Sequence, residues 1–241
     1  MPVRRATANE VWIATGLAGV ATAIGVKVAE VSHLPLALGI VVTAIFPAAS
    51  TLLVTFTFAL LRNTERGRRW LAAANWIEGY WHIVTLSAPN DARPVPSGLM
   101  YVHYQGANND LVVVVYRQHS DQGRRVISSS ESTLAYFRDD DHRFMNVCVQ
   151  RWGGNEDQAI GVGTLLRDGT SEYPTFYEGW MIRATEGIYR RQLAWRIPPD
   201  VIASAKNAQG EGLSWISRVI DGQDKLAKTT GRIRSRQGRG T

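Results

Sequence analysis

The chain has 241 residues and a formal net charge of +6, and its single cysteine, Cys148, excludes an internal disulfide framework. Its five histidines show no metal-ligand spacing, and the sequence has no glycine-rich phosphate loop, no H-E-x-x-H and no G-x-S-x-G. We therefore expect no catalytic residues, no metal and no cofactor, and we interpret Cys148 as a packed thiol in a reducing compartment.

The positive charge is concentrated in two segments. Residues 62–69 hold four Arg and one Glu, and residues 225–241 hold six Lys or Arg and no acid. Setting these segments and residues 1–61 aside leaves 14 basic and 18 acidic residues, so the central part of the chain is mildly acidic. This distribution argues against polymeric DNA or RNA as a partner.

The first predicted elements are two apolar helices. Residues 34–61 contain no charged residue and no histidine, and at ~1.5 Å per residue such a helix exceeds the ~30 Å hydrocarbon core of a bilayer. Residues 11–29 are apolar apart from Lys27, which lies near the end of the segment. The pattern predicts a transmembrane helical hairpin at residues 11–61, after an N-terminal segment at residues 1–10. The alternative is a buried helical hairpin in a soluble protein.

Arginines flank both outer ends of this hairpin. Two precede it and four follow it, and the positive-inside rule then places both termini in the cytoplasm and the protein in the cell inner membrane. Residues 62–75 are interpreted as a basic juxtamembrane linker that contacts membrane lipids. The residues expected at the membrane interface are Arg62, Arg66, Arg68, Arg69 and Trp70.

Residues 76–197 alternate between apolar runs and turn-rich links, a pattern typical of antiparallel strands. The eight expected strands are "WIEGYWHIVTLS", "GLMYVHYQG", "DLVVVVYRQH", "RRVISSSESTLAYFR", "RFMNVCVQRW", "AIGVGTLLR", "TFYEGWMIRAT" and "IYRRQLAWRI". Short links between all of them favour an all-β, eight-stranded antiparallel up-and-down barrel, which is lipocalin-like in form. A β-sandwich is the competing fold. The consecutive acids Asp139, Asp140 and Asp141 are expected in a turn.

Two details favour the barrel. The segments "IEGYWHIVT" and "YEGWMIRAT" share Glu, Gly and Thr at matched positions, and glycine permits a bend or a close backbone approach. The sequence Gly79-Tyr80-Trp81 resembles the G-x-W of lipocalins, in which an Arg of the last strand packs over the Trp. Arg191 or Arg196 is expected in that role, and an ordinary aromatic core strand is the alternative.

After the barrel, two prolines end the last strand and a C-terminal helical segment with short helices is expected at residues 198–228. Leu213, Ile216, Val219 and Ile220 give its second helix one apolar face. Residues 229–241 are almost free of apolar residues and are predicted to be a disordered basic tail.

This order of elements is similar to that of the SMODS-associating two-transmembrane, β-strand-rich effectors of bacterial CBASS antiphage systems. The resemblance covers about residues 10–200 and includes the segments "WIEGYW" and "FYEGWM…YRRQLAWRI". It implies that a minimal barrel binds a cyclic dinucleotide second messenger. It further implies that binding drives homo-oligomerisation, which disrupts the inner membrane and causes cell death.

A cyclic dinucleotide site needs arginines for phosphates and aromatic faces for bases. In the last strand, the apolar residues Tyr189, Leu193, Trp195 and Ile197 predict that Arg191 points inward, and that Arg190 and Arg196 point outward. The same argument in the seventh strand places Tyr177 and Arg183 inside. The predicted ligand-binding residues are Tyr104, Arg117, Tyr177, Arg183 and Arg191.

Three functional classes therefore compete. A ligand-gated membrane effector accounts for both the hairpin and the polar aromatic strands. A membrane-tethered, lipocalin-like carrier or sensor of a lipid or another hydrophobic ligand would require an apolar interior without convergent arginines. A scaffold with a filled barrel, or an unrecognised enzyme, is the third class.

The membrane topology is directly testable. A reporter fused after Thr241 should be active only on the cytoplasmic side, because six arginines flank the outer ends of the hairpin. Matched cytoplasmic and periplasmic reporters provide the measurement, and activity on the periplasmic side would contradict the predicted topology.

Overall fold

The computed structural model describes residues 8–31, 36–72, 76–86, 96–105, 110–121, 124–138, 141–152, 155–168, 170–184, 187–209 and 212–230. It divides into two compact units, Met1–Ala73 and Ala74–Thr241, which we describe separately. The predicted turn between the two apolar helices, residues 73–75 of the predicted linker and residues 231–241 of the predicted tail lie outside the described residues. The tail prediction, which began at residue 229, is wrong at its start, because a helix extends to Thr229 and Thr230 caps it.

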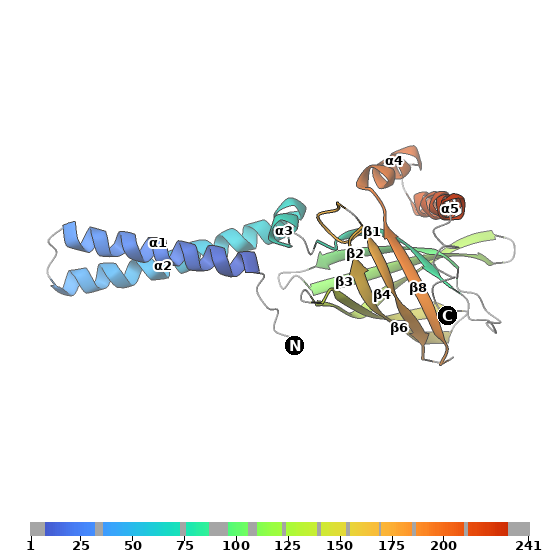
Figure 1. Ribbon diagram of the computed structural model, residues 1–241, viewed down its shortest axis with the longest axis horizontal. Coiled ribbons are helices and arrows are strands. Elements are labelled where there is room, and N and C mark those ends of the chain that lie inside the picture. The colour runs from blue at the N-terminus through green and yellow to red at the C-terminus, as the bar shows by residue number, and fades with distance from the viewer. Residues whose placement is uncertain are drawn as a thin grey trace. The chain divides into compact units, whose positions relative to one another are not determined.

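The N-terminal unit is helical. Helices α1 (Ala8–Val31) and α2 (Leu36–Asn63) pack side by side, as Figure 1 shows. Within the described residues, no helix meets the length and apolarity needed to cross a membrane. The membrane location of the hairpin stays a prediction.

A third helix, α3 (Glu65–Ala72), occupies the segment that we expected to be a basic linker. It begins at Thr64, whose hydroxyl accepts a hydrogen bond from the Gly67 amide at 3.0 Å, as an N-cap residue does. Of the predicted interface residues, Arg66, Arg69 and Trp70 are exposed. The other two are partly buried, and the Arg68 guanidinium donates to the Arg62 carbonyl at 3.0 Å.

The C-terminal unit is a closed antiparallel barrel in which consecutive strands pair and β1 pairs with β8 (Figure 1). The expected eight-stranded up-and-down barrel is confirmed, and the β-sandwich is wrong. The strands are β1 (Gly79–Thr85), β2 (Gly98–Gln105), β3 (Asp110–Asp121), β4 (Arg124–Arg138), β5 (Arg143–Trp152), β6 (Asn155–Leu166), β7 (Phe176–Arg183) and β8 (Tyr189–Arg196).

One half of the barrel interior is a packed apolar core. Its largest members are Trp81 of β1, Phe144 of β5 and Tyr177 of β7, and valines of β2 and β3 fill the space between them. Burying each large apolar side chain of this kind contributes about 1.5–3 kcal/mol. This half of the barrel interior is therefore occupied by side chains.

Arg196 of β8 closes the barrel at the start of β1. Its guanidinium lies 5.5 Å from the Trp81 ring centroid and donates to the carbonyls of Trp76 at 2.7 Å, Glu78, and Pro174 at 3.3 Å. Gly79 has φ +140°, and a Cβ there would come within 3.3 Å of Arg196 Nη2. The expected Arg over Trp81 is confirmed, and it is Arg196.

Helices α4 (Pro199–Gln209) and α5 (Ser214–Thr229) cover the outer face of β1, β2 and β3 (Figure 1). Ile216, Val219 and Ile220 of α5 are buried there against Leu99 of β2, which confirms the predicted apolar face, whereas Leu213 is exposed. A polar contact fixes the position of α5 as well. Asp224 accepts hydrogen bonds from His82 of β1 at 2.8 Å and from the Ser97 hydroxyl at 2.7 Å.

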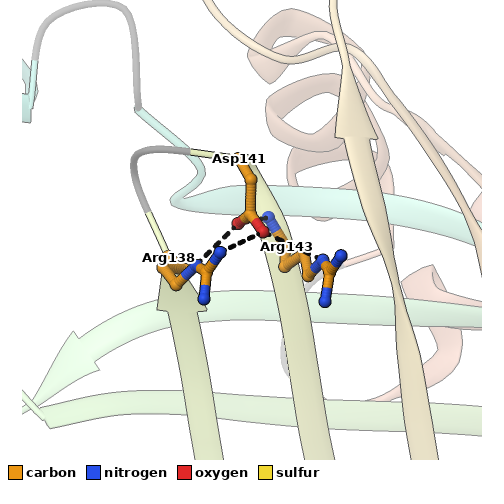
Figure 2. Close-up of polar contacts among 3 residues, drawn as sticks. All are labelled: Arg138, Asp141 and Arg143. Atoms are coloured by element: carbon orange, nitrogen blue, oxygen red, sulfur yellow. Dashed lines mark hydrogen bonds and ion pairs between the residues drawn. The ribbon is translucent and has the colours of Figure 1, made fainter.

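The turn between β4 and β5 contains the last of the three consecutive acids. Figure 2 shows Asp141 between Arg138 and Arg143, with ion pairs of 2.6 and 2.9 Å. Desolvation alone would raise the pKa of Asp141, but the hydrogen bonds from Arg138 and from the Arg143 amide hold it below its ordinary value. The expected turn is confirmed at Asp141 and His142, and Asp139 and Asp140 lie outside the described residues.

Replacing Asp224 by Asn should lower stability in a pH-dependent manner. Burial raises the pKa of Asp224, but the hydrogen bonds from His82 and Ser97 outweigh it and hold the pKa below its ordinary value of 3.8. The ionised carboxylate therefore stabilises the fold above about pH 3.8, and this contribution is lost as the pH falls through the lower, folded-state pKa.

The expected loss is roughly 1 kcal/mol at pH 7, discounted because Asp224 is partly exposed, which corresponds to a Tm lower by about 2–4 °C. The measurement is thermal unfolding of wild type and Asp224→Asn between pH 3 and 7. Asp168→Asn, in the exposed β6–β7 connection, serves as control. A Tm difference that persists unchanged at pH 3 would contradict the ionic origin.

Candidate ligand-binding site inside the barrel

The strand register identifies which side chains of β8 face the interior. Arg196 pairs with Trp81, and Ala194 pairs with Tyr177, both of which are core residues. Alternation then places Gln192 and Arg190 inside as well. Gln192 is buried, and its amide donates to the Thr85 hydroxyl at 3.3 Å and to the Met181 sulfur at 3.2 Å.

The predicted orientation of β8 is therefore wrong. We expected Arg191 inside and Arg190 and Arg196 outside, because Tyr189, Leu193, Trp195 and Ile197 are apolar. These apolar side chains of β8 lie on the outer face instead, where Trp195 contacts the rings of Phe176 and His82. Hydrophobicity does not mark the interior of this strand because Leu193 is buried on the outer face, just as Ala194 is buried on the inner face.

Arg191 points outward and binds its neighbour on β7. Its guanidinium donates two hydrogen bonds to Oε1 of Glu178, one of them from Nε at 3.1 Å. The prediction that Arg191 binds the ligand was based on an inward orientation, and Arg191 does not have that orientation.

Three buried arginines face the interior from three different strands. Arg117 of β3 is 4% exposed, Arg183 of β7 is 7% exposed and Arg190 of β8 is 1% exposed. Their registers place them at the same end of the barrel, because Arg117 pairs with Gly98 at the start of β2, and Arg183 lies at the end of β7. This end is opposite to the one that Arg196 closes.

Arg117 and Arg183 are close enough to influence each other, although β3 and β7 lie on opposite sides of the closed barrel. Burial lowers the pKa of Arg117 to about 10, the Cys148 thiol opposes this effect, and the positive charge of Arg183 adds to it. Arg117 Nη1 donates to the Pro96 carbonyl at 2.6 Å, whereas its Nε has no hydrogen-bond partner among the described residues.

Neutral polar side chains accompany the arginines. Asn146 of β5 and Gln192 both lie next to Gly161, where an added Cβ would be 2.4 Å from the Asn146 Oδ1 and 3.5 Å from the Gln192 Oε1. Cys148 is buried in the same region against Met181. None of the inward-facing strand positions with a described side chain is Asp or Glu. The described charges that face inward at this end are those of the three arginines, and they favour an anion.

Tyr177 also faces the interior, as predicted, and is 1% exposed. Its ring fits because Gly163 and Gly179 lie beside it, and a Cβ on Gly179 would come within 2.4 Å of its hydroxyl. Burial raises the pKa of Tyr177, and its hydroxyl has no hydrogen-bond partner among the described residues.

The structure brings two of the five predicted site residues, Arg117 and Arg183, into one cluster. Tyr104 faces inward but pairs with Leu111 at the far end of β2 and lies away from the arginines. Sequence reasoning missed Arg190, Gln192 and Asn146. The signal for Arg190 was available, because an Arg196 placed over Trp81 requires Arg190 and Gln192 to be inside too.

No metal-binding cluster of three or more His, Cys, Asp or Glu side chains occurs in the described part of the chain. Comparisons of the chain with protein families, curated proteins and solved structures give no match.

Replacing Arg117 by Met distinguishes a binding arginine from a structural one. Burying a charge costs desolvation free energy, so an arginine that is not needed to hold the fold can be replaced by an apolar side chain of similar length without loss of stability. We expect Arg117→Met to unfold at or above the wild-type temperature.

The matched comparison is Arg196→Met. This substitution removes the hydrogen bonds to three backbone carbonyls and the contact with the Trp81 ring, and it should lower the free energy of unfolding by roughly 3 kcal/mol or more. Thermal unfolding of the full-length variants measures both. Equal destabilisation by the two substitutions would mean that Arg117 holds the fold together as Arg196 does.

Proposed function

We propose that this protein is a ligand-gated membrane effector of a bacterial antiphage (CBASS) system. The barrel binds a cyclic dinucleotide at its arginine-rich end. The bound form self-associates through its helices, disrupts the inner membrane and causes cell death. The arginine cluster is the observation that supports a cyclic dinucleotide as the ligand. The apolar hairpin supports the membrane location.

The arginine cluster suits a ligand with two phosphates. Arg117 and Arg183 lie on opposing strands, and Arg190 lies on the strand next to Arg183, so charges reach the interior from both sides. A guanidinium binds phosphate oxygens through paired, charge-assisted hydrogen bonds, and these are the strongest that a side chain offers. The amides of Asn146 and Gln192 supply donors and acceptors of the kind that pair with base edges.

The hairpin supports the membrane part of the proposal through its sequence and its surface. Residues 34–61 have no charged side chain, and the two outer ends carry arginines. In α1, a Cβ added at Gly16 or Gly19 would meet nothing within 4 Å, so these positions face away from α2. Small residues on an open helix face allow close helix–helix contact between copies in a membrane.

The lipid-carrier alternative is less well supported. A carrier needs an apolar cavity, but here the apolar half is filled by Trp81, Phe144 and Tyr177, and the other half contains buried arginines. We propose binding without turnover, so a bound cyclic nucleotide should be recovered intact.

Calorimetric titration of the full-length protein in detergent with a panel of cyclic dinucleotides tests this function. Arg117→Ala and Arg183→Ala should each weaken binding by roughly ten- to a hundredfold, because each removes charge-assisted hydrogen bonds to phosphate. Arg→Lys at the same positions should give a partial loss, because the charge remains and the planar fork does not.

Arg191→Ala is the matched control, because Arg191 lies on the outer face and binds Glu178. It should bind the ligand as wild type does. Failure of the wild type to bind any cyclic dinucleotide would overturn the proposed function. Unchanged affinity in an Arg117→Ala, Arg183→Ala double variant would overturn the assigned site.

A further inference from the structure

The outer face of β5, β6 and β7 carries an apolar surface that lies away from α4 and α5, the described helices of the C-terminal unit. Two rows of neighbouring residues cross these strands, since Met145 pairs with Val162 and Val162 with Trp180, and Val147 pairs with Ile160 and Ile160 with Ile182. We call these six residues the β5–β7 face. Val162 is 44% exposed and Trp180 is 55% exposed.

The neighbouring strands extend this apolar character. Leu134 and Tyr136 of β4 and Tyr189 of β8 continue the two rows and are also exposed. The helices α4 and α5 lie instead on β1–β3, on the other side of the barrel (Figure 1). Contiguous exposed apolar patches of this extent mark interaction sites in soluble domains.

The charged row beside the face indicates its partner. Arg143 of β5 pairs with Thr164 of β6, and Thr164 pairs with Glu178 of β7. In this row, a basic side chain on β5 and an acidic side chain on β7 therefore flank β6. A two-fold axis along β6 that brings two copies face to face exchanges β5 with β7. It places Arg143 of each copy opposite Glu178 of the other.

The same axis matches the apolar rows. Val162 and Ile160 meet their own counterparts, Met145 meets Trp180, and Val147 meets Ile182. Each apolar side chain thus finds an apolar partner, as an isologous interface requires. Side chains from two stacked sheet faces fill a layer about 10 Å thick, and the curvature of an eight-stranded barrel restricts the contact to these central strands.

Both charged residues can take part without breaking their contacts within the chain. Arg143 binds Asp141 through Nε at 2.9 Å (Figure 2), and Arg191 binds Glu178 through its Oε1. A guanidinium has further donors and a carboxylate has further acceptor positions, so each can add a contact at the rim.

We propose that the β5–β7 face is an interface between two copies of this chain, related by a two-fold axis along β6. The proposed function includes self-association, and this interface assigns a surface of the barrel to it. The inference rests on the proposed function in this respect. It also predicts which residues meet at the axis.

Cysteine cross-linking in the full-length protein tests the axis. In a Cys148→Ala background, which removes the only native cysteine, Val162→Cys should form a disulfide-linked dimer under mild oxidation. Asn207→Cys, on the exposed surface of α4, is the control and should cross-link more slowly by roughly tenfold or more, because association does not bring it to its counterpart. Equal rates at the two positions would overturn the interface.

Charge exchange tests the register. Arg143→Glu and Glu178→Arg should each slow cross-linking at Val162, by roughly tenfold, because each places like charges opposite one another. Combining them should restore the rate. Within one chain these two residues lie on strands separated by β6, so recovery in the double variant reports contact between copies. Failure to recover would overturn the two-fold arrangement.

Calorimetry on the same variants separates this proposal from the function. Cross-linking at Val162 without binding of any cyclic dinucleotide would leave the interface standing and remove the proposed ligand. Binding of a cyclic dinucleotide without preferential cross-linking at Val162 would support the proposed ligand and overturn the interface.

Discussion

The contact between Arg196 and Trp81 determines the arrangement of the barrel. The arginine belongs to the last strand and the tryptophan to the first, and the guanidinium also holds three backbone carbonyls at the base of the barrel. Because side chains alternate along a strand, this single contact places Gln192 and Arg190 inside and Arg191 outside. The set of side chains that line this part of the interior thus follows from the position of Arg196, which also closes the barrel.

The interior divides into an apolar half and a half that contains buried arginines. Trp81, Phe144 and Tyr177 fill the first half with apolar contacts. In the second half, Arg117 and Arg183 are buried close together and their charges repel. Proteins retain such unfavourable groups where a ligand offsets their cost. An anion of the proposed kind would offset this repulsion and stabilise the barrel as it binds.

The sequence was sufficient to predict the two N-terminal helices, the eight strands and the inward orientation of Tyr177 and Arg183, because periodicity and turn residues are local signals. It failed at β8, where Leu193 and Trp195 are packed on the outer face and alternation alone suggests the wrong side. The G-x-W pattern contained the correction, since it predicted an Arg over Trp81. Arg190 was missed because its orientation depends on that long-range pairing.

The pairing of β1 with β8 also orders events during synthesis. Neither strand can complete the barrel until almost the whole domain has been made, because the partners of Trp81 and Ile83 are Arg196 and Ala194. Chains emerge from the ribosome at about 5–20 residues per second. One edge of β1 therefore stays unpaired for several seconds, until β8 has been synthesised. The apolar hairpin is complete by then, and the arginines enter the interior only when the last strand adds to the sheet. Because these contacts join distant parts of the chain, we expect barrel closure to be a slow step of folding.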